Sequence, residues 1–430
     1  MNSIMRLFLH SKGPLNPRSL AISGLLALAC AAPSALAEDW PCWRGPRGDG
    51  SIHEADIPTR WSDSENIAWK AEIPGLGHAS PIVWHDRVFV VSCLTDTTER
   101  VLICLDRNSG RRLWQQTLFK APLEKKHSLN SFASSTPATD GQNVYVSFLD
   151  VNKMMIAAYD FSGRQRWLVH PGVFSSVHGY CSSPIVYDDK LIINGDHDGD
   201  SYLVALDRAT GEIAWKTPRE NKTRSYCTPI IRTIEGQPQM ILSGSKSVGA
   251  YDPRSGVPLW TIDGPTEQFV ASMVDNGKLV FLTAGFPEHH ILALRPNGRG
   301  NVTDSAIVWR STENTSYVPS PLIVGDYFLV VSDNGIASCY EAETGQRQWK
   351  QRIGRHYSAS LVSAGGLAYF LSDDGVTKII KPGPHFDLVA ENALGESCYA
   401  SPAASASHLF IRTEHHLISI GPSTAAQASR

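Results

Sequence analysis

The stretch HGYCSSPIVYDDKLIINGDHDGDSYLVALDRATGEIAWK, residues 178–216, decides the fold of this chain. It contains four short runs of β-branched, apolar and aromatic residues, at 185–187, 190–194, 202–206 and 212–216. Asp and Gly residues separate these runs, a pattern typical of antiparallel strands joined by tight turns. A single sheet of four short strands cannot bury both of its faces, so this unit requires similar units beside it.

Three features of this stretch recur in the same order along the chain: a Ser/Thr-Pro pair, an Asp-to-Gly turn, and a Trp four residues after the Gly. The pair, or a degenerate form of it, begins eight units, at residues 80, 136, 183, 228, 272, 320, 360 and 401. The tryptophans stand 40 to 53 residues apart, at Trp69, Trp114, Trp167, Trp215, Trp260, Trp309 and Trp349. A period near 45 residues with four strands per unit is typical of a β-propeller.

The two ends of the chain complement each other. The last unit, which begins at Ser401, has room for only three strands, whereas IAWKAEI at 67–73 is an unpaired strand ahead of the first unit. We expect this strand to complete the last sheet, because closing the ring hides the sheet edges. The prediction is an all-β, eight-bladed β-propeller of four-stranded antiparallel blades. Seven blades is the alternative, since the unit at 357–394 lacks the Asp turn and has Val389 in place of its Trp.

The repeat also resembles a known sequence signature. ALDRATGEIAW at 205–215 matches the pattern A-x-D-x-x-T-G-x-x-x-W of the pyrroloquinoline-quinone-type (PQQ-like) repeat, and the segments at 104–114, 251–260 and 339–349 are similar. The resemblance implies that each Trp packs on the turn Gly of the adjacent blade. Proteins with this repeat include quinoprotein alcohol and glucose dehydrogenases and the BamB lipoprotein of outer-membrane assembly. The resemblance therefore implies the fold without deciding the function.

The N-terminal 37 residues have the pattern of a signal peptide. Basic Arg6, Lys12 and Arg18 precede an apolar run at about 20–32, and Ala-Leu-Ala at 35–37 fits a cleavage site. The apolar run is too short to cross a bilayer. We expect an exported protein, periplasmic or secreted, with lipid attachment at Cys30 as the alternative. An irregular segment is expected at 38–66, which resembles at 39–51 the N-terminal motif of secreted propellers, followed by the propeller at 67–421 and a disordered tail at 422–430.

Charge and cysteine content exclude some classes of function. The formal net charge is −3, and no basic run is longer than two residues, which argues against binding to nucleic acid. Seven cysteines follow the signal peptide without a C-x-x-C pair, which argues against a zinc site. Cys93 and Cys104 fall on consecutive predicted strands, so they are either a disulfide across the hairpin or two buried thiols.

The residues just before each Ser/Thr-Pro pair are the candidate binding site. In a propeller the first strand of each blade lines the central channel, so these residues reach one mouth of the channel. Aromatic, histidine and arginine side chains predominate there: His78, Phe132, His178, Tyr180, Arg224, Tyr226, Phe269, Tyr317, His356, Tyr357 and Tyr399. Aromatic walls with a few polar groups suit a small molecule or a peptide. The alternative is that these side chains fill the mouth.

Metal and cofactor sites are not expected. Asp196, Asp198 and Asp200 alternate in one loop, and such carboxylates are a candidate Ca²⁺ site, but the closing Glu of an EF-hand is missing, so we expect a polar turn. The adjacent cysteines and large insertions of quinoprotein dehydrogenases are also missing, so neither PQQ nor Ca²⁺ is predicted as a cofactor.

These observations together predict a monomeric, non-catalytic binding or scaffold module of the cell envelope. Its expected partner is an envelope protein, or a small molecule or peptide, at the propeller mouth. The alternative is a PQQ-dependent dehydrogenase. No catalytic residue is predicted, since the sequence contains no G-x-S-x-G, P-loop or H-E-x-x-H motif.

Overall fold

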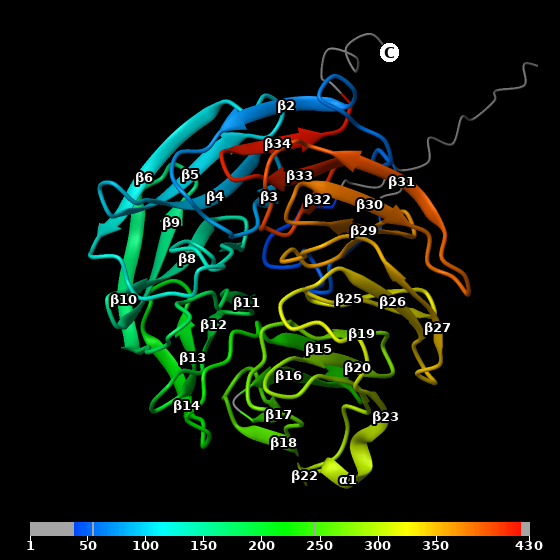
Figure 1. Ribbon diagram of the computed structural model, residues 1–430. Coiled ribbons are helices and arrows are strands. Elements are labelled where there is room, and N and C mark those ends of the chain that lie inside the picture. Colours follow the sequence, from blue (N-terminus) through cyan, green and yellow to red (C-terminus); the bar gives the residue numbers. More distant parts are fainter. Residues whose placement is uncertain (1–37, 54–55, 245, 423–430) are drawn as a thin grey trace, which may run out of the picture. The chain divides into compact units, whose positions relative to one another are not determined.

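The computed structural model describes residues 38–53, 56–244 and 246–422. The predicted signal peptide, Cys30 and residues 423–430 of the predicted tail lie outside the described residues. Within the described part, eight antiparallel sheets stand side by side in a ring (Figure 1). The prediction of an eight-bladed, all-β propeller is therefore confirmed, and the seven-bladed alternative is wrong.

Each sheet is one blade, and its strands are ordered from the ring axis towards the periphery. Blade 1 contains β3 (Ile82–Trp84), β4 (Arg87–Leu94), β5 (Glu99–Asp106) and β6 (Arg112–Lys120), and blade 2 contains β7 (Ala138–Thr139), β8 (Asn143–Asp150), β9 (Lys153–Asp160) and β10 (Gln165–Val173). Blade 3 contains β11 (Ile185–Tyr187), β12 (Lys190–Gly195), β13 (Tyr202–Asp207) and β14 (Ile213–Pro218), and blade 4 contains β15 (Ile230–Ile234), β16 (Gln237–Gly244), β17 (Ser247–Tyr251) and β18 (Pro258–Asp263).

The second half of the ring repeats this order. Blade 5 contains β19 (Val274–Asp275), β20 (Val280–Ala284), β21 (His290–Leu294) and β23 (Ile307–Ser311), and blade 6 contains β24 (Leu322–Val324), β25 (Tyr327–Val331), β26 (Ile336–Glu341) and β27 (Arg347–Arg352). Blade 7 contains β28 (Val362–Ala364), β29 (Leu367–Leu371), β30 (Val376–Ile380) and β31 (Leu388–Ala393), and blade 8 contains β32 (Ala403–Ser405), β33 (His408–Arg412), β34 (His416–Ile420) and the N-terminal β2 (Ile67–Glu72).

The two ends of the described chain close the ring in blade 8. Strand β2 pairs antiparallel with β34, with Lys70 opposite Ile418 and Glu72 opposite His416. In Figure 1 the blue β2 lies directly above the red β34. This pairing is the one expected from the missing fourth strand of the last unit, and it covers an edge that would otherwise expose free amides and carbonyls.

The two middle strands of a blade are buried because neighbouring blades cover both faces of the sheet. In blade 1, six consecutive residues of β4 and six of β5 are buried, whereas the outer strand β6 is only partly buried. This explains why the middle strands read as continuous apolar runs rather than alternating ones.

The Asp-to-Gly turn fixes the outer hairpin of a blade. In blade 3 the Asp207 carboxylate accepts hydrogen bonds from the amides of Ala209 and Thr210, each at 2.9 Å. Gly211 closes the turn with a φ of +80°, a conformation that is costly for other residues. One extra residue in β14 forms a β-bulge, which shifts the strand register and brings Trp215 opposite the small Ala205.

The tryptophans join consecutive blades, as the resemblance implied. Trp167 of blade 2 lies against Gly211 of blade 3, where an added Cβ would come within 2.8 Å of the indole, and its Nε1 donates to the carbonyl of Arg208 at 3.0 Å. The same contact is formed between Trp69 and Gly110, Trp114 and Gly163, Trp215 and Gly256, and Trp309 and Gly345. Trp260 differs, because its Nε1 donates to Gln239 within its own blade at 2.9 Å.

Two blades depart from the repeat. In blade 5 the long loop contains β22 (Gly300–Asn301), which adds a parallel strand to β18 of blade 4, and the short helix α1 (Thr303–Ala306). In blade 7, Ala390 pairs with Ile379 and occupies the position that corresponds to Trp349 in blade 6. The expectation that Val389 stands there is wrong by one residue, since the bulge in β31 leaves Val389 36% exposed.

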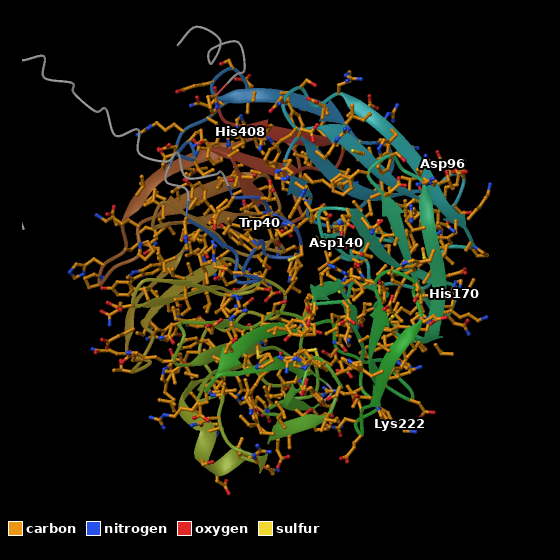
Figure 2. All side chains as sticks on the ribbon, turned by 180° about the vertical axis from the view of Figure 1, so that it is seen from behind. Trp40, Asp96, Asp140, His170, Lys222 and His408 are labelled. Atoms are coloured by element: carbon orange, nitrogen blue, oxygen red, sulfur yellow. The ribbon has the colours of Figure 1, made fainter. Side chains whose placement is uncertain are left out.

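The segment before β2 lies across one end of the ring. It contains β1 (Ser51–Ile52), which pairs with β28 of blade 7, and Trp40, which forms a bridge with Val83 of blade 1. Figure 2 shows Trp40 near the centre of the ring and Lys222 at its periphery. Among the described residues, no helix has the length and apolar character needed to cross a bilayer.

Candidate functional site

The Ser/Thr-Pro pairs form a belt of hydrogen bonds around the ring axis. The backbone amide of one blade's Ser or Thr donates to the side-chain hydroxyl of the next blade's Ser or Thr, at 2.8–3.1 Å. These bonds run from Ser80 to Thr136, from Thr136 to Ser183, from Ser272 to Ser320, from Ser320 to Ser360 and from Ser360 to Ser401. The motif that marks each repeat thus positions the segments that precede it.

Inside this belt lies a cavity of about 530 Å³, which we call the mouth cavity. This volume is within the range of small-ligand sites, roughly 300–1,000 Å³. Trp43 of the N-terminal segment contributes to its wall, with Nε1 donating to the Ser272 hydroxyl at 2.8 Å. The Arg44 guanidinium holds this segment in place by donating to the carbonyls of Pro321 and Leu361. Most of its lining residues precede the first strands of the blades or lie in the hairpins after the second strands, so the cavity lies at that face of the ring.

Eight of the eleven predicted mouth residues line this cavity: His78, His178, Arg224, Tyr226, Tyr317, His356, Tyr357 and Tyr399. They come from blades on all sides of the axis. The His78 ring stacks on Tyr399, with centroids 4.6 Å apart, and thereby joins blades 1 and 8 at the mouth. The side chains form a wall around a space rather than filling it.

The other three predicted residues pack within or between the blades instead of lining the cavity. Phe132 lies between the cations Arg100 and Lys126, at 5.7 and 5.1 Å from its centroid. Tyr180 is 4% exposed and its hydroxyl hydrogen-bonds to Ser147, while Phe269 is fully buried in the core between blades 4 and 5. These three residues do not line the cavity. Tyr180 and Phe269 stand next to Cys181, Gln268 and Val270, which do line it, because neighbouring positions in an extended segment face opposite sides.

Several cavity residues lie outside the predicted set. Trp43 comes from the N-terminal segment, and His127 and Leu129 come from the connection between blades 1 and 2. Phe286, Asp333 and Asp373 come from hairpins between the second and third strands of blades 5, 6 and 7. The two aspartates follow equivalent strands in the sequences SDNG and SDDG. This recurrence is a signal that the sequence offers, whereas the position of Trp43 depends on how the whole segment crosses the ring.

The basic side of the mouth cavity carries little free positive charge. The Arg224 guanidinium is paired with Asp198, whose two carboxylate oxygens both lie 2.8 Å from Nη1. Burial, reinforced by the nearby charges of Arg412 and Lys126, lowers the pKa of His78 to about 4. Burial and the Arg224 charge also lower the pKa of His178. Both imidazoles are therefore neutral hydrogen-bonding groups at pH 7.

The acidic loop at 195–201 is occupied by ion pairs. Asp196 pairs with Arg219 at 3.0 Å, Asp198 with Arg224 at 2.8 Å, and Asp200 with Lys222 at 2.6 Å. The three carboxylates thus face three different cations of the connection between blades 3 and 4, and they do not converge on one point. Among the described residues, no group of three or more His, Cys, Asp or Glu side chains is placed to hold a metal ion.

The cysteines of the described residues are all free. The expected alternative of a Cys93–Cys104 disulfide is wrong, because the strand register places Cys104 opposite Phe89 and Cys93 opposite Arg100. Burial raises the pKa of Cys104 to about 12, and it raises the pKa of Cys181 in the cavity wall to about 12 as well. These thiols are poor nucleophiles at neutral pH.

Comparison with known proteins identifies the family. Residues 97–351 and 298–381 match the family model described as outer membrane protein assembly factor BamB. A curated relative, outer membrane protein assembly factor BamB of Shewanella oneidensis, is 23% identical over 195 residues. That alignment covers 43% of this chain and 46% of the relative, so the chain matches about half the length of that protein.

Solved structures show the same architecture. BamB from Moraxella catarrhalis superposes with a TM-score of 0.60 at 13% identity, over 82% of this chain and 99% of that chain. A quinohemoprotein alcohol dehydrogenase from Pseudomonas putida HK5 gives 0.52 at 12% identity, over 89% and 80% of the two chains. At such identities these likenesses show the fold alone. The family model, however, spans well over half of the sequence, and the chain therefore belongs to the outer membrane protein assembly factor BamB family of PQQ-like repeat propellers.

Proposed function

We propose that this protein is a non-catalytic binding or scaffold module of the cell envelope, exported as a monomer, which recognises a protein partner at its mouth cavity. The observation that carries the proposal is the match of residues 97–381 to a family named for outer membrane protein assembly. A propeller fold also serves enzymes, so the proposal rests on the chemistry of the cavity as well.

The rim of the mouth cavity suits a protein partner. Leu129 is 66% exposed and Phe286 is 52% exposed, and they belong to connections in opposite halves of the ring. Both line the cavity, so the apolar rim surrounds a polar and aromatic interior. Exposed apolar side chains around a recess are typical of surfaces that bind other proteins.

The cavity does not suit the cofactor of the quinoprotein dehydrogenases. Pyrroloquinoline quinone carries three carboxylates, which require free cationic partners. In the mouth cavity Arg224 is already paired with Asp198, and blades 6 and 7 contribute the carboxylates of Asp333 and Asp373. The residues present therefore do not fit this anionic group.

Photo-crosslinking in intact cells tests the binding proposal. A photoreactive amino acid at position 129 or 286 is compared with one at position 213, which is 51% exposed on the outer strand of blade 3. We expect one discrete adduct with an envelope protein from both mouth positions and none from position 213. Adducts of equal yield from all three positions, or from none, would count against the mouth as the recognition site.

A second assay tests the alternative function. The purified protein is incubated with the quinone and Ca²⁺, and dye-linked oxidation of alcohols and aldose sugars is followed. We expect no turnover above that of protein lacking the quinone. Sustained turnover with retained cofactor would replace the binding proposal by a dehydrogenase.

A further inference from the structure

Two carboxylates with fixed positions line the mouth cavity, Asp333 in blade 6 and Asp373 in blade 7. Asp333 accepts hydrogen bonds from the amides of Tyr317 and Val318, at 2.8 and 3.0 Å. Asp373 accepts from the amide and the hydroxyl of Ser358, at 2.7 and 3.0 Å. These bonds hold both carboxylates at equivalent positions of adjacent blades, beside the aromatic segments that line the mouth.

Neither of these two carboxylates forms an ion pair among the described residues. Asp333 and Asp373 hydrogen-bond to amides and a hydroxyl, whereas Arg224, elsewhere in the cavity wall, is paired with Asp198. Burial raises the pKa of both carboxyls, and the charge of Asp333 contributes to the rise at Asp373; the nearby His289 and His356 act in the opposite direction but do not outweigh burial. A cation placed between them would relieve both the desolvation and the mutual repulsion.

The surfaces next to the carboxylates are aromatic. Tyr317, whose amide donates to Asp333, lines the cavity together with Phe286 of the neighbouring blade 5 and Trp43 of the N-terminal segment. The faces of aromatic rings attract cations, by about 0.5–2 kcal/mol where water is excluded. The cavity thus offers carboxylates for a charge and rings for the apolar stem that carries it.

From this arrangement we propose that the mouth cavity binds an organic cation, the guanidinium or ammonium group of an arginine or lysine side chain on the protein partner. The charged group lies against Asp333 and Asp373, and its methylene stem lies along Tyr317 and Phe286. This inference rests on the proposed function and names the chemistry that the partner must supply. An arginine or lysine in an exposed loop of an envelope protein meets this requirement.

Calorimetric titration of the purified protein with capped tripeptides tests the inference. The probe is acetyl-Gly-Arg-Gly-amide, and its control is the citrulline peptide, which has nearly the same shape without the charge. We expect the arginine peptide to bind at least tenfold more tightly, with a preference that shrinks as NaCl is added. Equal affinity of the two peptides would overturn the inference. Because this comparison uses the unmodified protein, it does not depend on any variant folding.

Substitutions locate the site. The double variant Asp333→Asn/Asp373→Asn should lose the arginine preference, by tenfold or more in affinity. The matched control, Asp374→Asn, removes the next carboxylate of the same turn, which is exposed and hydrogen-bonded to Ser372, and should change affinity less than twofold. Loss of binding in the control, or retention of the preference in the double variant at an unchanged melting temperature, would refute the assignment.

Two further outcomes separate this inference from the proposed function. Free agmatine that binds at least tenfold more tightly than the arginine peptide would indicate a small free cation as the ligand and would refute a protein side chain as its source. A discrete mouth adduct in cells, combined with no preference for arginine or lysine over citrulline, would leave the proposed function in place and overturn the cation.

Discussion

The contact between Trp69 and Gly110 joins the closing strand β2 to blade 1, and its strength can be worked out from the structure. Gly110 has a φ of +69°, and an added Cβ would lie 2.5 Å from the indole of Trp69. Gly110→Ala should therefore cost about 1–2 kcal/mol for the left-handed backbone and about 1–3 kcal/mol for displacing the indole.

Substitution of Trp69, the other residue of the contact, isolates the cost of displacing the indole. Trp69 is 8% exposed, rests near Phe410 and donates to the carbonyl of Arg107 at 2.7 Å, so Trp69→Ala should cost about 3–5 kcal/mol. In the double variant the indole is absent, and Gly110→Ala should then cost only its backbone contribution. The two substitutions should thus be non-additive by about 1–3 kcal/mol.

Equilibrium urea unfolding, followed by circular dichroism, measures these free energies of unfolding. Gly277→Ala is the matched control, because Gly277 has a φ of +82° and no heavy atom within 4 Å of an added Cβ. It should cost about 1–2 kcal/mol, for the backbone alone. If Trp69→Ala and Gly110→Ala add within about 0.5 kcal/mol, the close contact does not hold the ring shut and the reasoning fails.

Three other results are expected. Asp196→Asn leaves the buried Arg219 without its counter-charge and should lower the free energy of unfolding in urea by about 3–5 kcal/mol. Asp200→Asn breaks an exposed ion pair and should leave the stability near that of wild type. Similar losses in both variants would contradict this account. Desolvation acts to raise the pKa of Glu396, but hydrogen bonds from Thr413, His415 and His416 outweigh it and hold the pKa at about 2. The ionised Glu396 should stabilise the fold by up to about 3 kcal/mol above pH 4.5, and this contribution should be lost as the pH falls towards 2. Glu396→Gln should therefore lower the free energy of unfolding at pH 7 and match wild type in acid. A difference in free energy of unfolding that stays constant with pH would contradict this account. Alkylation of the protein from residue 38 onward in denaturant without reductant should modify seven cysteines by mass spectrometry, and five would indicate a disulfide.

The repeat pattern was sufficient to predict the ring, because each blade is built from local signals. The Asp-to-Gly turn, the Trp after it and the apolar middle strands are each contained within about 40 residues, and the same contacts recur between neighbours. The closing strand was also predictable, because one unit lacked a strand and one strand lacked a unit. Blade 7 was harder, since without a Trp only the position of a bulge decides whether Val389 or Ala390 faces the core.

The candidate site was predictable only where symmetry determines it. Position within the repeat placed His78, Arg224 and Tyr317 at the mouth, but it could not tell which side of an extended segment a ring would face, so Tyr180 and Phe269 were misplaced. Trp43 in the cavity wall comes from a segment outside the repeat, and the path of that segment depends on bonds to several blades at once.

The division between repeated and unrepeated parts also explains how a symmetric ring acquires a directional site. Eightfold repetition alone would give a ring of equivalent residues and no preferred orientation for a ligand. Here Arg224, in the connection between blades 3 and 4, is paired with Asp198, whereas Asp333 and Asp373 of blades 6 and 7 form no ion pair among the described residues, so negative charge is concentrated in that part of the wall. Trp43 lines the cavity from a segment outside the repeat, and the exposed Leu129 and Phe286 line it from two connections of the ring. A partner that inserts a cationic side chain, as proposed above, would therefore place its charge on the side of blades 6 and 7.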